Sequence, residues 1–561
     1  MSQREAAAEK GFSNGNAHAG DNLQISTFRR ALPQFLATSA KNLILMDLGM
    51  TLAFPTLVIA ALLKSKSGLH FDDAAASWFG SIPFICQPIG SIISGTVLEP
   101  LGRKKSMLLV NIPHFIGWYL FYTAISLPVL FLAAILMGLG VGFMEAPVIT
   151  YVGEISEPKL RGVLTSYSGI FVTIGLIVEF LLGTLYDWNT AAFISCFVPI
   201  VTFVAITQVP ETPMWLLSKG RVKEAEKSLQ WLRGWVPASL VQNELNELIR
   251  YSDASKLVLK DKPSIKQTAN NKENSTYSNP VNLEDELPNG KKVAENNPDV
   301  ITFVNGANGV IINTPAPPTN NNLPTENTSL EGSQRKATVA EILQDLIRPQ
   351  MRRPFFLVIA FFVFHNGSGF PAMRPYMVNI FQELRFPVDA NWATVIISCI
   401  GFLGVIVCTV SVGYVGKRTL TLGSMAGCAS STLGLSVWSL LNENSPDKSL
   451  CWTPFILFIL LSFSFSFGLA PIPWMILSEV FPFRGRGFAS GCAAAVSYIL
   501  GFITAKTFLD LKSTLSLSGV FSLYGSITVT GIVYVYFKLP ETEGKSLQDI
   551  EKFYNEKKVK K

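Results

Sequence analysis

Two pairs of charged side chains recur at the same spacing in the two halves of the chain. Glu154 is followed seven residues later by Arg161, and Glu479 is followed seven residues later by Arg486. A carboxylate and a guanidinium at this spacing can form ion pairs across neighbouring helix ends. No nucleophile with an adjacent base, no phosphate-binding loop and no metal cluster accompanies them in the sequence. We therefore expect a mechanical role for these charges, no enzymatic activity, and neither a cofactor nor a metal.

Each charged pair lies where a long apolar segment ends. The chain has 561 residues, of which 49% are hydrophobic and only 15% are charged, whereas a soluble protein carries about a quarter. Apolar runs long enough to cross a bilayer as helices predict twelve spans in an all-α polytopic membrane protein. The runs lie at about 43–63, 77–98, 106–127, 128–151, 164–186, 190–209, 355–381, 391–415, 419–441, 453–478, 488–510 and 515–538.

The tenth run contains an interruption. Pro471 and Pro473 precede Trp474 in an apolar segment that opens near Trp452. Proline removes a backbone donor and kinks a helix. In a membrane such breaks are tolerated where the backbone lines a cavity, as in the discontinuous helices of transporters. The sequence therefore predicts a helix broken at mid-depth beside a central cavity.

The remaining segments are polar and divide the chain into five parts. Within the long central linker we expect a helix at 218–250, disorder at about 254–334, where Asn, Pro, Thr and Glu dominate, and a helix at about 338–348. The parts are an N-terminal tail (1–42), a first six-helix bundle (43–210), the linker (211–354), a second six-helix bundle (355–538) and a C-terminal tail (539–561).

The distribution of basic residues predicts the orientation. Short loops on one side carry nine lysines and arginines and those on the other carry five, which places the first side, the linker and both termini in the cytoplasm. The net charge of +6 comes from short clusters between spans rather than from one basic face. This pattern indicates contact with a lipid bilayer and argues against nucleic acid as a partner. It does not identify a protein partner.

Both charged motifs and the Pro-Ile-Pro-Trp run resemble those of the sugar porter family of the major facilitator superfamily. The branch they resemble most contains insect facilitated trehalose transporter-like and glucose transporter-like proteins. The segment from Gly95 to Lys104 resembles the loop signature of the superfamily, with Glu99 where aspartate is usual. In its counterpart in the second half, Gly413 replaces the acidic residue. Pro-Glu-Thr follows the last span of each half, as in sugar porters, although Met214 stands where arginine is usual.

The resemblance implies a cytoplasmic network of ion pairs that holds the two bundles together in one state and separates in the other. Exposed pairs contribute only about 0–1 kcal/mol each, so a network can bias two states without freezing either. The same charges could instead only cap helices and follow the positive-inside rule. The expected gate residues are Glu99, Arg103, Glu154, Arg161, Glu211, Glu479 and Arg486.

The resemblance also implies a central site for a hexose or a trehalose-like disaccharide. The paired glutamines usual in the seventh helix are replaced here, Pro371 replaces an asparagine, and Gly169 stands where glutamine is typical in the fifth helix. Hydroxyls need polar partners beside aromatic faces, so the identity of the sugar is open. The expected substrate-binding residues are His365, Asn366, Tyr376, Trp474, Ser497 and Tyr498.

Charged residues inside the predicted spans leave the transport mode open. Asp47 and Glu179 are the candidates for proton coupling, because ionisable groups within a membrane are costly and usually functional. We expect a facilitative sugar transporter that works by alternating access, with the plasma membrane as its location by resemblance. The alternatives are a proton-coupled sugar symporter, a non-transporting membrane sugar sensor, and a carrier of a non-sugar organic solute, which Arg374 would favour.

Overall fold

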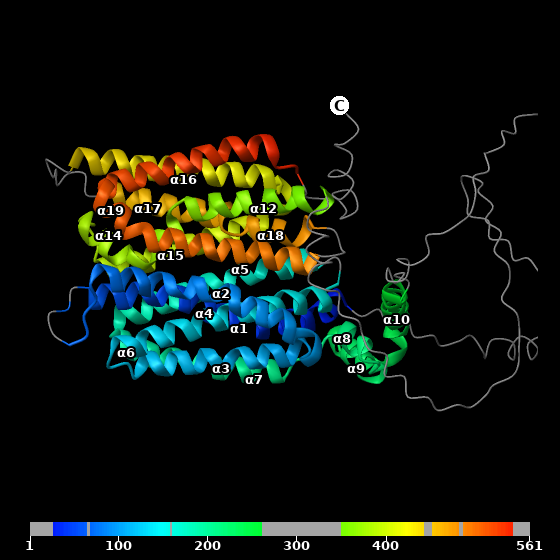
Figure 1. Cartoon of the computed structure of the whole chain (residues 1–561). Coiled ribbons are helices and arrows are strands. Elements are labelled where there is room, and N and C mark those ends of the chain that lie inside the picture. The colour runs from blue at the N-terminus through cyan, green and yellow to red at the C-terminus, as the bar shows by residue number, and fades with distance from the viewer. Residues whose placement is uncertain are drawn as a thin grey trace, which may run out of the picture. The chain divides into compact units, whose positions relative to one another are not determined.

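The computed structural model describes residues 26–63, 65, 68–157, 160–260, 349–442, 452–481 and 486–541. Within these residues all regular elements are helices, and the long ones pack side by side (Figure 1). Nine described helices are long and apolar enough to cross a membrane, or ten if a helix pair bent by 43° forms one span. The all-α, multi-span architecture predicted from the apolar runs is confirmed.

Seven helices form the first half. The predicted sixth span consists of two of them, because α6 and α7 are separated at Cys196. The elements are α1 (Thr27–Leu62), α2 (Asp73–Leu101), α3 (Arg103–Tyr122), α4 (Leu127–Ile155), α5 (Arg161–Leu185), α6 (Trp188–Ser195) and α7 (Phe197–Thr207).

The second half contains the bent and broken spans. The long α19 covers two predicted spans that meet at Ser516, whose φ of 60° departs from helical geometry. The elements are α12 (Pro349–Gly367), α13 (Phe370–Met373), η1 (Arg374–Tyr376), α14 (Met377–Glu383), α15 (Ala390–Val415), α16 (Lys417–Asn442), α17 (Trp452–Ser464), η3 (Phe465–Leu469), α18 (Ile472–Glu479) and α19 (Arg486–Lys538).

The first helix is longer than its apolar run. It begins at Thr27 rather than at residue 43, with the Ser26 side chain accepting a hydrogen bond from the Arg29 amide at 3.2 Å. The added turns bury polar residues such as Gln34 and Lys41 against the protein. Hydropathy could not identify this segment as helix because its buried face is polar. The boundary predicted between a tail and a first bundle at residues 42 and 43 is therefore wrong.

The helix predicted at 218–250 is three helices. These are α8 (Pro213–Ser218), α9 (Val222–Leu232) and α10 (Ala238–Lys260), and Gly234, with φ of 102°, lies in the turn before α10. They share a small apolar core, and α10 runs past the predicted boundary of disorder. The rest of the segment at 254–334, the helix predicted at 338–348, and the tails up to residue 25 and beyond residue 541 lie outside the described residues.

The predicted interruption of the tenth span is present as a local change of helix type, while Trp452–Leu477 remains one span. A π-helical turn, η3, connects α17 to α18 immediately before Pro471. The hydroxyl of Ser424 on α16 accepts a hydrogen bond from the Leu469 amide at 2.8 Å and donates one to the Ser464 carbonyl at 2.6 Å. A neighbouring helix thus satisfies the backbone groups that the break releases, as a membrane interior requires.

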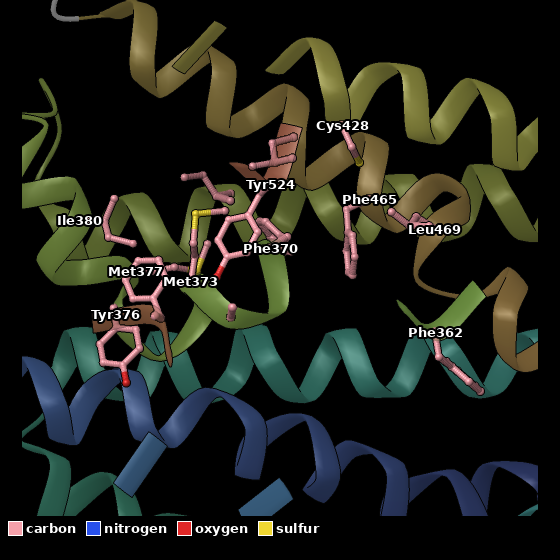
Figure 2. Packing of buried hydrophobic residues seen from close by; sticks show 14 of the residues in the cluster. Phe362, Phe370, Met373, Tyr376, Met377, Ile380, Cys428, Phe465, Leu469 and Tyr524 are labelled. Carbon is pink, nitrogen blue, oxygen red and sulfur yellow. The ribbon is translucent and has the colours of Figure 1, made fainter. Parts of the chain in front are cut away.

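The bend after α12 is packed by aromatic residues. Gly369, with φ of 82°, turns the chain where an added Cβ would lie 2.2 Å from the Tyr524 ring. Phe370 follows and lies 4.9 Å from the ring of Phe465 on η3. Figure 2 shows Phe370, Met373 and Tyr524 gathered in this part of the core. The bend in this span and the break in the tenth span therefore share one packed region in the second half.

Candidate functional site

Ion pairs of the first half gather where α2 ends and α3 begins. We call this the basic end, defined by Arg103, Lys104, Lys417 and Arg418, and the other end of the bundles the opposite end. The guanidinium of Arg103 lies 2.7 Å from Glu154 and 3.2 Å from Glu99. The Thr212 hydroxyl donates to the second oxygen of Glu154 at 2.5 Å. Three predicted gate residues are therefore in contact.

Glu211 binds the beginning of a helix rather than a basic side chain. Its carboxylate accepts hydrogen bonds from the backbone amides of Arg103 at 3.1 Å and Lys104 at 3.0 Å, the first residues of α3. An anion is favourable at a helix N-terminus. Burial raises the pKa of Glu211, and the amides of Thr212, Lys104 and Arg103 act in the opposite direction. Glu211 therefore acts as a cap that fixes the loop between α2 and α3.

The second half repeats this cap with Glu541. Its carboxylate accepts hydrogen bonds from the Lys417 amide at 3.1 Å and the Arg418 amide at 3.0 Å, at the start of α16. In the sequence of this loop, Gly413 replaces the acidic residue. The acidic residue comes instead from the chain segment that follows α19, where Glu541 lies, so a carboxylate also fixes the loop between α15 and α16.

Replacing Gly416 by alanine should destabilise the second half. Gly416 has φ of 84°, and an added Cβ would lie 2.6 Å from the Glu541 carboxylate. A left-handed conformation costs a residue with a Cβ about 1–3 kcal/mol, and the clash would disturb the cap. Gly413→Ala is the matched control, because a Cβ at Gly413 meets nothing within 4 Å. Guanidinium unfolding in detergent should show a loss of stability for Gly416→Ala alone, and equal stabilities would contradict the cap.

Among the described side chains, Arg161 takes no part in these printed ion pairs. Arg161 is exposed at the first position of α5. The side chains of Glu479 and Arg486 lie outside the described residues. Sequence reasoning missed Glu157, which lies 2.6 Å from Arg30 and 3.3 Å from Arg233, while Arg233 also binds Glu244 at 2.6 Å. These contacts tie the start of α1 and the linker helices to the loop between α4 and α5.

Five of the six predicted substrate-binding residues form one cluster at the break in the tenth span. The Trp474 ring on α18 lies 5.0 Å from Phe362 and 6.0 Å from Tyr498. His365 Nδ1 is 2.9 Å from the Leu469 carbonyl, beside the π-helical turn. The Asn366 amide donates to the Ser497 carbonyl at 3.4 Å. Helices α12, α18 and α19 thus supply an aromatic and amide surface.

The sixth predicted residue, Tyr376, has a packing role in this structure. It is 1% exposed, its ring stacks on Phe508 at 5.0 Å, and its hydroxyl donates to the Ala505 carbonyl at 3.4 Å. Figure 2 labels it on the other side of the bend from Phe362. Tyr376 therefore closes the core toward the opposite end and is separate from the cluster around Trp474.

A carboxylate of the first half reaches this cluster. Glu145 on α4 accepts a hydrogen bond from the Tyr498 hydroxyl of α19 at 3.0 Å. The two residues are 353 positions apart in the sequence, so no local pattern could pair them. The contact brings a carboxylate to the polar and aromatic surface of the second half.

Hydrogen bonds between the halves also lie toward the opposite end. The Thr56 hydroxyl on α1 donates to the Arg374 carbonyl at 2.7 Å. The Ser77 hydroxyl on α2 donates to the Lys506 carbonyl at 2.7 Å, and the Lys506 ammonium lies 3.0 Å from the same hydroxyl. Thr51, Gln87 and Arg374 line a narrow cavity between the halves. The two bundles are therefore in contact at the opposite end in this structure.

The two residues predicted for proton coupling lie inside the first bundle. Asp47 is 3% exposed and accepts a hydrogen bond from the Trp118 indole at 2.7 Å, and His114 on the same helix α3 binds its other oxygen. Glu179, on α5, is fully buried and accepts a hydrogen bond from the Ser195 hydroxyl on α6 at 2.9 Å. All these partners belong to the first half.

Comparison with known proteins decides the family. The profile described as "Sugar (and other) transporter" matches residues 39–277 and 304–554. This chain belongs to the sugar transporter family. The expectations of a sugar porter resemblance and of a non-enzymatic protein are confirmed, because the relatives are transporters.

The relatives of this sugar transporter include insect proteins. It is 27% identical over 522 residues to the facilitated trehalose transporter Tret1 of Culex quinquefasciatus, covering 92% of this chain and 85% of the relative. Against Tret1 of Aedes aegypti the identity is also 27%, and the match spans 55% of that longer protein. The proton:xylose symporter XylE bound to 6-bromo-6-deoxy-D-glucose has a TM-score of 0.65, covering 94% of this chain and all of XylE at 16% identity.

At that identity the likeness to XylE concerns the fold, which is that of the major facilitator superfamily. Twelve helices in two six-helix bundles fit this fold. In the sugar transporter described here, sequence reasoning missed three buried polar residues: Lys41, which donates to Ser168 at 2.8 Å, His114 and Trp118. The signal available for His114 and Trp118 was a side chain able to form hydrogen bonds within the apolar run at about 106–127, whereas Lys41 precedes the first predicted run. Their partners lie on other helices, so the sequence could not assign them a role.

Proposed function

We propose that this sugar transporter carries a hexose or a trehalose-like disaccharide by facilitated diffusion, with its two bundles rocking about a central site. The observation that carries the proposal is the cluster of Trp474, Tyr498 and Asn366 at the broken tenth span, faced by Glu145 from the other half. Aromatic faces suit the apolar side of a sugar ring, and amide and carboxylate groups suit its hydroxyls.

Alternating access explains why the contacts between halves lie where they do. The bonds from Thr56 and Ser77 to the second half hold the opposite end closed. The capped and ion-paired helix ends lie at the basic end, which the positive-inside rule assigns to the cytoplasm. On this assignment the described state faces inward, and both termini are cytoplasmic. The plasma membrane is the proposed location.

Facilitated transport is favoured over proton coupling by the position of the buried acids. Asp47 and Glu179 bind only first-half groups in their described contacts. When rigid bundles rock against each other, the surroundings of groups deep inside one bundle stay the same. A proton site must change its affinity between the two states to drive transport. We therefore propose that Asp47 and Glu179 stabilise the first bundle.

Replacing Trp474 by alanine should weaken sugar binding. The indole packs between Phe362 and Tyr498 and is the largest aromatic face of the cluster. We expect KM for sugar uptake to rise about tenfold, which corresponds to about 1.4 kcal/mol of binding free energy. Trp474→Phe keeps an aromatic face and should have a smaller effect. An unchanged KM for the alanine variant, at unchanged thermal stability, would exclude Trp474 from the site.

The proposal is tested by uptake of labelled glucose and labelled trehalose into proteoliposomes, with and without an inward proton gradient. Saturable uptake of either sugar that is indifferent to the gradient supports a facilitator. Stimulation by the gradient would assign the protein to the symporters instead. Absence of uptake of both sugars by folded protein would overturn the sugar assignment. Uptake of a panel of labelled organic anions would then test the alternative solute that Arg374 favours.

A further inference from the structure

We infer that Glu145 is a substrate-binding residue. Its carboxylate accepts a hydrogen bond from Tyr498 in the sugar-free state and from sugar hydroxyls when the sugar is bound. This inference rests on the proposed function and specifies which group recognises the polyhydroxy ligand. It is carried by the hydrogen bond from the Tyr498 hydroxyl to Glu145 Oε2 at 3.0 Å.

The position of Glu145 separates it from the other acids of the membrane region. Asp47 and Glu179 are enclosed by first-half groups, whereas Glu145 projects from α4 to a partner on α19. Tyr498 in turn lies 6.0 Å from the Trp474 ring, next to the broken helix. A ligand seated against Trp474 would therefore approach both Tyr498 and Glu145.

The chemistry of a carboxylate suits this place. An ionised carboxylate has two oxygens and about four acceptor sites, and it donates nothing. Tyr498 occupies one of these sites. Two adjacent hydroxyls of a sugar ring can each donate a hydrogen bond to one oxygen of such a carboxylate. The amides that the sugar porter resemblance leads one to expect are replaced in this chain, and Glu145 compensates for them.

The same contact couples binding to rocking. Tyr498 and Glu145 belong to different halves, so their hydrogen bond depends on how the bundles are placed. A sugar that replaces the Tyr498 hydroxyl would exchange one bond between the halves for bonds to the ligand. Binding then changes the relative free energies of the two states, as alternating access requires.

The inference predicts that replacing Glu145 and replacing Tyr498 shift KM in opposite directions. A hydrogen bond that only links the two halves does not predict this. Glu145→Gln removes the carboxylate and should raise KM for labelled sugar about tenfold. Tyr498→Phe keeps the ring against Trp474 but frees the carboxylate, and should lower KM. If the bond only tied the halves together, removing either partner would break the same bond and shift KM in the same direction.

The experiment is uptake of labelled glucose and trehalose by wild-type protein, Glu145→Gln and Tyr498→Phe in proteoliposomes, with thermal unfolding of each as the control for folding. Opposite shifts of KM support the inference. Shifts of KM of the same sign, or an unchanged KM in Glu145→Gln, would overturn the inference about Glu145. The proposed function would still stand if the wild-type protein takes up sugar. Absence of uptake by the wild type would overturn both.

Discussion

Replacing Asp47 by alanine is expected to lower the free energy of unfolding by about 3–5 kcal/mol, because breaking a buried pair leaves its partner uncompensated. Asp47 receives the Trp118 indole N–H at 2.7 Å and a ring nitrogen of His114, and all three side chains are buried. Guanidinium unfolding of the detergent-solubilised protein, followed by tryptophan fluorescence, measures the loss.

Asp47→Asn provides the matched control. The asparagine keeps an oxygen that can accept the Trp118 hydrogen bond, so the loss of stability should be smaller than for alanine. If Asp47 stabilises the bundle rather than coupling to protons, uptake by this variant should respond to a proton gradient as the wild type does. A fully stable alanine variant, or a variant whose gradient response changes, would contradict the structural role.

A disulfide between Ser77→Cys and Lys506→Cys is expected to abolish uptake when oxidised and to release it when reduced. The Ser77 hydroxyl reaches the Lys506 backbone carbonyl at 2.7 Å, so the backbones of α2 and α19 approach closely, as a disulfide requires. A bridge there would hold the opposite end closed. Uptake by the double variant with and without reductant measures the effect.

Each single cysteine variant is the control for this experiment, since the chain has seven cysteines of its own. The single variants should be indifferent to oxidant and reductant. A bridged protein that transports at the wild-type rate would show that the opposite end need not open, which is incompatible with alternating access.

Features carried by local patterns were predicted well. Proline in the tenth span was enough to predict its interruption, because proline lacks the backbone N–H that a helix needs whatever its surroundings. The Ser424 hydroxyl accepts the hydrogen bond of a backbone amide at the interruption. The apolar runs predicted the spans, because the membrane demands long apolar helices. The loop signature supplied Arg103 and the charged motif supplied Glu154, which are in contact, whereas Arg161 of the same motif is exposed.

Features that depend on partners far away in the sequence were not predicted. Glu541 caps α16 from 124 positions away, and no charge in the loop itself indicates this. Tyr376 was expected in the site but lies stacked in the core, because an aromatic residue satisfies either role. The start of α1 was missed because its buried face contains polar residues such as Gln34. A hydropathy pattern assigns such residues to the solvent.

Transport between two alternating states is tested most directly by counterflow. Proteoliposomes loaded with unlabelled trehalose or glucose are diluted into labelled sugar, without any ion gradient. A facilitator with a single alternating site should accumulate label transiently above its external concentration, and the Ser77→Cys/Lys506→Cys protein should do so only when reduced. Label that never exceeds equilibrium, in vesicles holding folded protein, would contradict a sugar carrier that works by alternating access.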